Sequence, residues 1–221
     1  SKKTNGELTM KSITLHLVVA GATYFNQLDR FQGWSGTPLT ATGEQATAKV
    51  AQQLASTTFD TAFASDTSRA IQTARIILDS RAQPVKLRTV VALRAPFYGG
   101  FEGTERAAVW SGFATKLGYQ SVAAFAADQT PSELQTLLHD HDADGLAESG
   151  QEFWDRYQKG LQQVMTATPD HGQVLLVVDG ATLRMMHYVA TGCAATRQAL
   201  APSVVTTMVY TGDKLIVPVT E

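Results

Sequence analysis

The sequence predicts an α/β fold in which a doubly wound, mostly parallel sheet is flanked by helices. Strand-like and helix-like segments alternate along the chain, which is the pattern of parallel strands joined by crossover helices. Two strand-sized segments, residues 13–19 and 173–178, are almost entirely apolar and run into glycines, as central strands covered on both faces do. In a three-layer α/β/α arrangement the carboxyl ends of these two strands would meet at a switch point of the sheet, where ligands bind.

The first half of the chain is expected to alternate between strands and helices. The expected elements are, in order, a strand, a helix, a strand, a helix and a strand, over residues 12–19, 39–56, 59–65, 66–80 and 85–93. The first helix has apolar residues at helical spacing and Thr42 as its expected cap. The second helix is amphipathic, and its expected inward face consists of Ala70, Ile71, Ala74 and Ile77.

The second half contains an expected insertion and then a return to regular elements. Residues 97–150 are less regular, with Gly-rich, Ala-rich and acidic stretches, and we expect them to form a lid over the sheet. Ser149 and Glu152 have the spacing of a capping box in front of a helix over 150–165. The remaining expectations are a strand over 173–178, a helix over 181–190, a hairpin around 211–213, a single domain over 12–221 and a polar tail or linker over 1–11.

Composition and charge narrow the functional classes. Hydrophobic residues make up 44% of the 221 residues and charged residues 17%, which are values of a globular protein. The net charge of −2 gives no electrostatic reason to expect nucleic acid or an anionic membrane surface as a partner, and no apolar stretch is long enough to span a bilayer. The single cysteine, Cys193, excludes an internal disulfide and is expected to be a small buried residue. Because the chain starts at Ser1, a segment is expected to have been removed, and the compartment stays open between the cytoplasm and export after loss of a signal segment.

Several motifs follow one another in a fixed order along the chain. They are Gly21, Thr23 and Asn26 after the first strand, "RFQGW" at 30–34, "TPLTATGEQA" at 37–46, "SDTSRAIQTA" at 65–74, "LR" at 93–94, "FEG" at 101–103, "ES" at 148–149, Arg156, and "VLLV" and "GATLR" between 174 and 184. Together these motifs resemble the histidine phosphatase superfamily, in the branch that contains cofactor-dependent phosphoglycerate mutase. The resemblance implies a phosphoglycerate mutase-like fold with a phosphate-transfer cleft.

The resemblance also implies which positions carry the chemistry. In that family a first histidine attacks phosphorus, two arginines and a second histidine hold the phosphoryl oxygens, and a glutamate protonates the leaving oxygen. In this chain those positions hold Val19 for the first arginine, Ala20 for the nucleophile, Ala22 for a loop glutamate, Ala95 for the acid and Asp179 for the second histidine. Gly36 stands in place of an aspartate, and Arg69 remains from the charged core of the site.

These replacements predict a pseudoenzyme. Ala20 cannot be phosphorylated and Ala95 cannot donate a proton, and general acid–base catalysis alone typically contributes about 10²–10⁴ in rate. None of the five histidines falls on either catalytic position. Two alternatives stay open. One is a phosphatase-like enzyme with an altered mechanism or substrate in the same cleft, and the other is a metal- or partner-binding structural protein.

Some pocket residues are expected to remain. The remnants implied by the resemblance are Thr23, Asn26, Arg69, Glu102, Asp179, Gly180 and Ala181. A small ligand in this vestigial phosphate cleft is the partner that the sequence allows; no cofactor is expected, and no protein partner is identified. We predict that Arg69 pairs with Asp179, because a buried arginine without an anion would be costly.

The acidic stretch "DHDADG", residues 140–145, begins like a calcium loop. Its candidate oxygen ligands are Asp140, Asp142, Asp144 and Glu148. The twelfth position of such a loop is Gln151 instead of glutamate, and His139 and His141 would suit a transition metal. The simpler interpretation, which we adopt, is a solvated acidic loop without a metal that leads into the capped helix.

Overall fold

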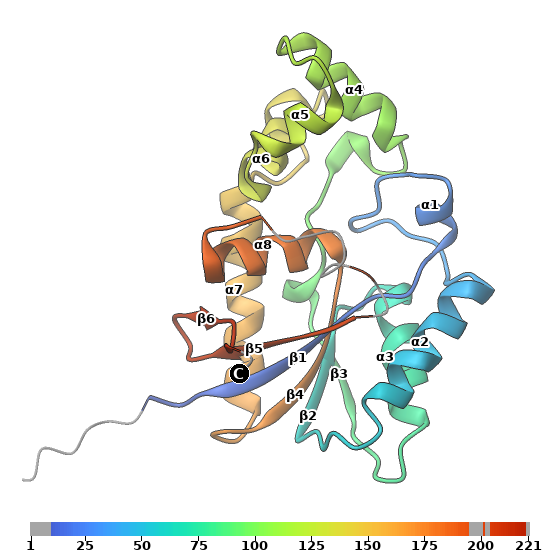
Figure 1. Ribbon diagram of the computed structural model, residues 1–221, viewed down its shortest axis with the longest axis vertical. Helices are drawn as coiled ribbons and strands as arrows, with labels where there is room; N and C mark the ends of the chain where they lie inside the picture. Colours follow the sequence, from blue (N-terminus) through green and yellow to red (C-terminus); the bar gives the residue numbers. More distant parts are fainter. Residues whose placement is uncertain (1–9, 195–200, 202–203, 220–221) are drawn as a thin grey trace, which may run out of the picture.

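The computed structural model describes residues 10–194, 201 and 204–219, so residues 1–9 of the expected tail lie outside the described residues (Figure 1). Its sheet has six strands in the order β3-β2-β4-β1-β5-β6. The strands are β1 Ile13–Val19, β2 Thr61–Ala64, β3 Leu87–Thr89, β4 Gln173–Val178, β5 Val205–Tyr210 and β6 Leu215–Ile216. Strands β3, β2, β4 and β1 pair in parallel, and β5 pairs antiparallel with β1 and β6. The predicted α/β fold with a mostly parallel sheet is confirmed.

Strands β1 and β4 form the centre of the sheet. They are parallel neighbours in a register that pairs Val19 with Val178, so their carboxyl ends meet at one edge, as the sequence predicts. Most of their side chains are buried, because helices cover both faces; the polar side chains Thr14, His16 and Gln173 lie in the first half of each strand and are partly buried.

Two pairs of helices form the outer layers (Figure 1). Helices α7 Gly150–Ala167 and α8 Gly180–Thr191 pack on the face of β1 that presents Leu15 and Leu17. Helices α2 Ala41–Gln53 and α3 Ser68–Asp79 pack on the opposite face. The fold is therefore a three-layer α/β/α arrangement, with separate apolar clusters on the two sides of the sheet.

Local details differ from the sequence-based expectations in the first half of the chain. Helix α2 is capped by Thr40, whose hydroxyl accepts a hydrogen bond from the N–H of Gly43 at 3.0 Å, while Thr42 already lies inside the helix. Ile71 of α3 is only partly buried, because the inward face is rotated toward Thr73. The strand expected over 85–93 ends after three residues as β3, at the edge of the sheet, and a 3-10 turn over Val91–Leu93 follows.

The insertion over residues 97–150 is more regular than expected. It contains α4 Arg106–Lys116, α5 Val122–Ala127 and α6 Pro131–His141, which lie together at one end of the molecule (Figure 1). Helix α6 begins with a capping box between Thr130 and Glu133 and a proline in its first turn, which are helix-start signals. These helices share a small aromatic cluster around Phe31, Phe113 and Phe125.

Other expectations can be compared directly with the structure. The capping box of Ser149 and Glu152 at the start of α7 is confirmed, as is the hairpin between β5 and β6. Cys193 is exposed, so the expectation of a buried residue was wrong; it lies beyond the end of α8, outside the apolar core. In the described part of the chain, no helix is both long enough and apolar enough to cross a membrane.

Candidate functional site

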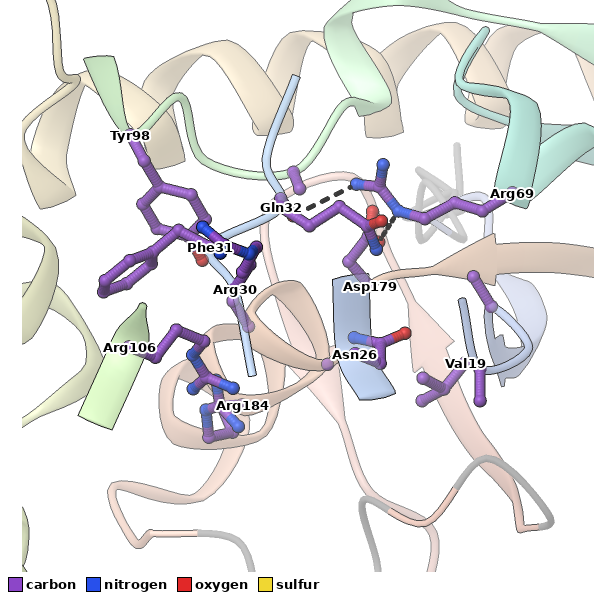
Figure 2. A pocket seen from close by; sticks show the side chains of 15 residues that line it. Val19, Asn26, Arg30, Phe31, Gln32, Arg69, Tyr98, Arg106, Asp179 and Arg184 are labelled. Carbon is purple, nitrogen blue, oxygen red and sulfur yellow. Dashed lines mark hydrogen bonds and ion pairs between the residues drawn. The ribbon is translucent and has the colours of Figure 1, made fainter. Parts of the chain in front are cut away.

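A cavity of about 310 Å³ lies where β1 and β4 end (Figure 2). Its walls come from the loop after β1, the segment around Phe31, the start of α3, the chain after β3, the start of α4 and the start of α8. The lining residues are Val19, Ala20, Ala22, Asn26, Arg30, Phe31, Gln32, Arg69, Ala95, Tyr98, Arg106, Asp179, Gly180, Ala181 and Arg184. The switch point of the sheet therefore holds the pocket, as is general for folds of this class.

The structure brings together the five positions that the resemblance assigns to the chemistry. Val19, Ala20, Ala22, Ala95 and Asp179 all line this one cavity, although the first and last are 160 positions apart in the sequence. The parallel pairing of β1 with β4 places Asp179 beside the loop after β1, and the backbone N–H of Ala20 donates a hydrogen bond to the carbonyl of Val178 at 2.8 Å.

Five of the seven expected pocket remnants belong to the lining of this cavity. Asn26, Arg69, Asp179, Gly180 and Ala181 line it. Thr23 does not line it: its side chain is fully buried and caps α1, the short helix Tyr24–Gln27. The Asn26 side-chain oxygen accepts hydrogen bonds from the backbone N–H and the hydroxyl of Thr23, at 2.9 and 3.0 Å. These two residues fix the shape of the loop after β1.

Glu102, like Thr23, lies outside the lining of this cavity. Its carboxylate accepts hydrogen bonds from the backbone N–H groups of Gly33, Trp34 and Ser35, at 3.1, 2.9 and 3.2 Å, and from the Ser35 hydroxyl. Charge-assisted bonds to several N–H groups hold a loop in one conformation. Glu102 is thus a positioning residue for residues 33–35, and the carbonyls of Gly33 and Ser35 in this segment accept hydrogen bonds from Arg69.

The predicted ion pair between Arg69 and Asp179 is confirmed. The Arg69 Nε donates to Oδ1 of Asp179 at 2.6 Å, and the two side chains are 2% and 14% exposed (Figure 2). The Nη atoms of Arg69 donate to the carbonyls of Ser35 at 3.1 Å and Gly33 at 2.7 Å. A β-carbon at Gly36 would lie 2.9 Å from Nη1 of Arg69, so the glycine at this position leaves room for the guanidinium where it now sits.

The backbone around Ala95 is held firmly although the side chain is only a methyl group. The Ala95 carbonyl accepts hydrogen bonds from Arg156 at 2.9 Å and from the indole N–H of Trp34 at 3.1 Å. Arg156 also forms a two-point ion pair with Glu148, with distances of 2.6 and 2.7 Å. The framework of the cleft is therefore fixed on this side by groups that do not themselves enter the cavity.

Three cavity-lining arginines were not recognised from the sequence. Arg30, Arg106 and Arg184 come from the loop after α1, the start of α4 and the second turn of α8. Arg30 and Arg184 were within the motifs "RFQGW" and "GATLR", but nothing in their spacing indicated that they would meet Arg106. The lining therefore carries four arginines against the single carboxylate of Asp179, which is a strongly positive balance in a chain whose net charge is −2.

Burial affects the electrostatics of this cluster. It is the main cause that lowers the pKa of the Arg184 guanidinium; interaction with Tyr98 opposes the shift, and the neighbouring Arg106 adds to it. Burial likewise raises the pKa of the Tyr98 hydroxyl, which stays protonated and able to donate a hydrogen bond. A charged group that is disfavoured by burial and by a like charge is stabilised when an anion binds next to it.

Two of the candidate metal ligands of the acidic stretch, Asp142 and Glu148, are engaged in other contacts. Asp142 accepts hydrogen bonds from the backbone N–H groups of Gly100, Asp144, Leu146 and Ala147, and these bonds outweigh burial and lower its pKa. Glu148 is engaged by Arg156. Within the described residues no group of three or more His, Cys, Asp or Glu side chains is arranged to hold a metal ion.

Comparisons with known proteins identify the family and the fold of this chain. Residues 15–217 match the family described as histidine phosphatase superfamily (branch 1). The chain is similar to a 2,3-bisphosphoglycerate-dependent phosphoglycerate mutase from Cytophaga hutchinsonii, with 30% identity over 175 residues that cover 78% of this chain and 76% of the relative. Among solved structures, it is similar to phosphoglycerate mutase from Bacillus anthracis, with a TM-score of 0.81, 26% identity and coverage of 96% of this chain and 93% of that chain. YhfR from Bacillus stearothermophilus, at 22% identity, a TM-score of 0.69 and coverage of 94% and 96%, shares the fold.

Proposed function

This chain belongs to the histidine phosphatase superfamily, and from that premise we propose that it is a non-catalytic member whose cleft binds a small anion. The observation that carries the proposal is the lining of the cavity. It carries four arginines, and at the positions that the resemblance assigns to the first arginine, the nucleophile, the loop glutamate and the acid it holds only isopropyl and methyl groups.

The missing groups are those that make and break bonds in this family. Phosphoryl transfer through an enzyme-bound intermediate needs a nucleophilic atom, and the Ala20 side chain has none. Departure of the substrate oxygen needs a proton, and Ala95 has none to give. Without both groups, the phosphoglycerate mutase activity named for the Cytophaga relative is not expected of this chain.

The alternative to a binding role is catalysis by an altered mechanism in the same cleft. Among the described lining residues the one carboxylate is that of Asp179, which would have to attack phosphorus. Its Oδ1 accepts a hydrogen bond from Arg69 at 2.6 Å, and Arg69 is 2% exposed. A carboxylate held in this way is stabilised as an ion-pair partner and is a poorer nucleophile, which favours the binding role.

Charge supports an anion as the ligand. Arg30, Arg106 and Arg184 line the cavity, and within the part of the chain that the structure describes neither Arg30 nor Arg184 has a carboxylate at ion-pair distance. The first backbone N–H groups of α8, which begins at Gly180 in the cavity wall, have no partner within the helix and add positive partial charge.

Two measurements test the proposal. We expect no turnover of a small aryl phosphate by the unmodified protein; turnover that disappears in Asp179→Asn would overturn the non-catalytic role. Thermal unfolding with and without millimolar phosphate or sulfate tests anion binding, since a ligand that binds only the folded state raises the unfolding temperature. The rise is expected to be smaller in Arg184→Gln, and no rise with any anion would contradict the binding role.

A companion experiment tests whether the scaffold is otherwise intact. The variant carries Val19→Arg, Ala20→His, Ala22→Glu, Ala95→Glu and Asp179→His together, and we expect measurable aryl phosphatase activity from it. Its matched control has the same set without Ala20→His and is expected to stay inactive, because it lacks the nucleophile. Equal activity in the two variants would show that the loss of the histidine does not explain the inactivity.

A further inference from the structure

We propose that the ligand of this cleft is an amphipathic organic anion, bound with its charged group on the cluster of Arg30, Arg106 and Arg184 and its apolar body on the floor formed by Val19 and the alanines. The inference rests on the proposed binding function and adds to it the chemical class and the orientation of the ligand.

The floor of the cavity is an extension of the apolar core. Val19 and Ala20 are 8% and 7% exposed, and Ala95 is 1% exposed. Val19 belongs to the large apolar cluster on one side of the sheet, and Ala20 belongs to a small cluster with Ala64. These side chains offer no hydrogen bond to water or to a phosphate oxygen, so the contact they favour is with an apolar group.

The ion pair of Arg69 and Asp179, beside this floor, has few free N–H donors and no unmatched positive charge for a phosphate. Arg69 donates through Nε to Asp179 and through its two Nη atoms to the carbonyls of Gln32, Gly33 and Ser35. Four of its five N–H groups are thereby used, and its charge is matched by a carboxylate at 2.6 Å. A second anion placed here would face Asp179 and would have to displace bonds that already exist.

The charged end of the cavity lies elsewhere. Figure 2 shows Arg106 and Arg184 together on one side of the pocket, beneath Tyr98, while Val19 lies on the opposite side. Arg184 makes no ion pair within the described residues, and the nearest carboxylate to Arg106 belongs to the exposed Asp29, at 3.8 Å. Guanidinium groups bind carboxylates and phosphates through parallel N–H bonds. Burial increases the strength of such contacts, and Arg184 is partly buried, whereas Arg30 is exposed and the Arg106 side chain is 39% exposed.

The size of the cavity limits the ligand. At about 30 Å³ for each water-sized group, 310 Å³ holds roughly ten non-hydrogen atoms. A carboxylate or phosphate headgroup takes three to five of them, which leaves about five to seven for an apolar body. Carboxylic acids with short alkyl chains and short alkyl phosphates fall in this range.

Calorimetric titration of the intact protein with two series of anions tests the inference. One series is linear carboxylates from acetate to octanoate, the other is alkyl phosphates from methyl to hexyl, and inorganic phosphate is the reference. We expect affinity to rise about fourfold for each methylene until the cavity is filled, and the series with the higher affinity at equal chain length identifies the headgroup.

Variants of the two ends of the cavity locate the ligand. Arg184→Gln is expected to weaken all members of a series by a similar factor of about ten, whereas the nearly isosteric Val19→Thr should weaken only the longer members. Arg88→Gln, at an arginine of the edge strand β3, is the matched control and should change nothing. The chain-length series on the unmodified protein decides the question even where a variant fails to fold.

The outcomes separate this inference from the function on which it rests. If phosphate binds as well as the alkyl anions and chain length has no effect, the orientation is wrong while the binding function stands. If no anion binds at all, both fail. If affinity rises with chain length but Arg184→Gln has no effect, the charged end has been misplaced and the inference is overturned.

Discussion

Replacing Asp179 by asparagine isolates the charge of the buried ion pair. The amide keeps the shape of the side chain and an oxygen that can accept from Nε of Arg69, so the change removes little besides the negative charge. Arg69 is 2% exposed and would be left as a buried cation whose remaining partners are backbone carbonyls. We expect Asp179→Asn to lower the free energy of unfolding.

The structure sets the size of the effect. Removing one partner of a buried pair costs about 3–5 kcal/mol. The three carbonyls that stay bonded to Arg69 and the amide oxygen of the new side chain reduce this to roughly 2–3 kcal/mol. For a chain of this length, that corresponds to a fall of about 4–12 °C in the unfolding temperature.

A second ion pair in the same chain provides the control. Arg94 and Asp66 are also 2.6 Å apart, but their side chains are 26% and 32% exposed. Asp66→Asn is therefore expected to cost less than about 1 kcal/mol. Urea unfolding of the two variants, with an unchanged dependence on denaturant, measures both costs. A cost for Asp179→Asn equal to or below that of Asp66→Asn would refute the reasoning from burial.

Three further predictions concern Glu102 and the acidic loop. Glu102→Gln is expected to cost about 1–3 kcal/mol of unfolding free energy and to make the Trp34 indole more accessible to a fluorescence quencher. The control Glu105→Gln should do neither, because the Glu105 side chain makes no capping hydrogen bond. Equal effects of the two variants would contradict the positioning role of Glu102. Asp142→Asn is expected to speed amide exchange over 142–147, with Asp140→Asn as control. Because hydrogen bonds from backbone N–H groups lower the pKa of Asp142, this stabilisation of the loop is fully present above pH 3.8 and is lost as the pH falls through the lowered pKa. Amide exchange at pH 6 that is the same in Asp142→Asn as in the unmodified protein would contradict this. Titration with millimolar calcium or zinc is expected to give no heat from the acidic loop, and a saturable heat would show a metal site there.

The sequence predicted most of the fold because the period of its apolar residues is unambiguous in the elements that form the core. Strands β1 and β4 are buried on both faces and read as continuous apolar segments, and α7 combines a capping box with an apolar stripe. Prediction was weaker at the edge of the sheet and in the insertion over 97–150. There the local propensities are mixed, and contacts such as the aromatic cluster around Phe113 decide the structure.

The candidate site was predicted only in part. Resemblance supplied the aligned positions of Val19, Ala20, Ala95 and Asp179, and charge complementarity supplied the pairing of Asp179 with Arg69. Neither could supply Arg106, whose place in the cavity depends on how α4 packs above the sheet. Glu102 was expected in the pocket, but its carboxylate points toward the backbone of residues 33–35. Which rotamer a side chain adopts depends on its surroundings in the folded protein, so the sequence alone did not predict it.

By itself the sequence determined the α/β alternation, the order of motifs and the residue types at the five positions that the resemblance aligns with reacting side chains, since these are properties of residue type and spacing along one chain. The tertiary structure decided which charges share a cavity. Arg30, Arg106 and Arg184 are far apart in sequence and converge only because the insertion and α8 pack over the ends of β1 and β4. Electrostatic interactions depend on distance and burial in space, so a chain with a net charge of −2 can hold a cleft that is strongly positive.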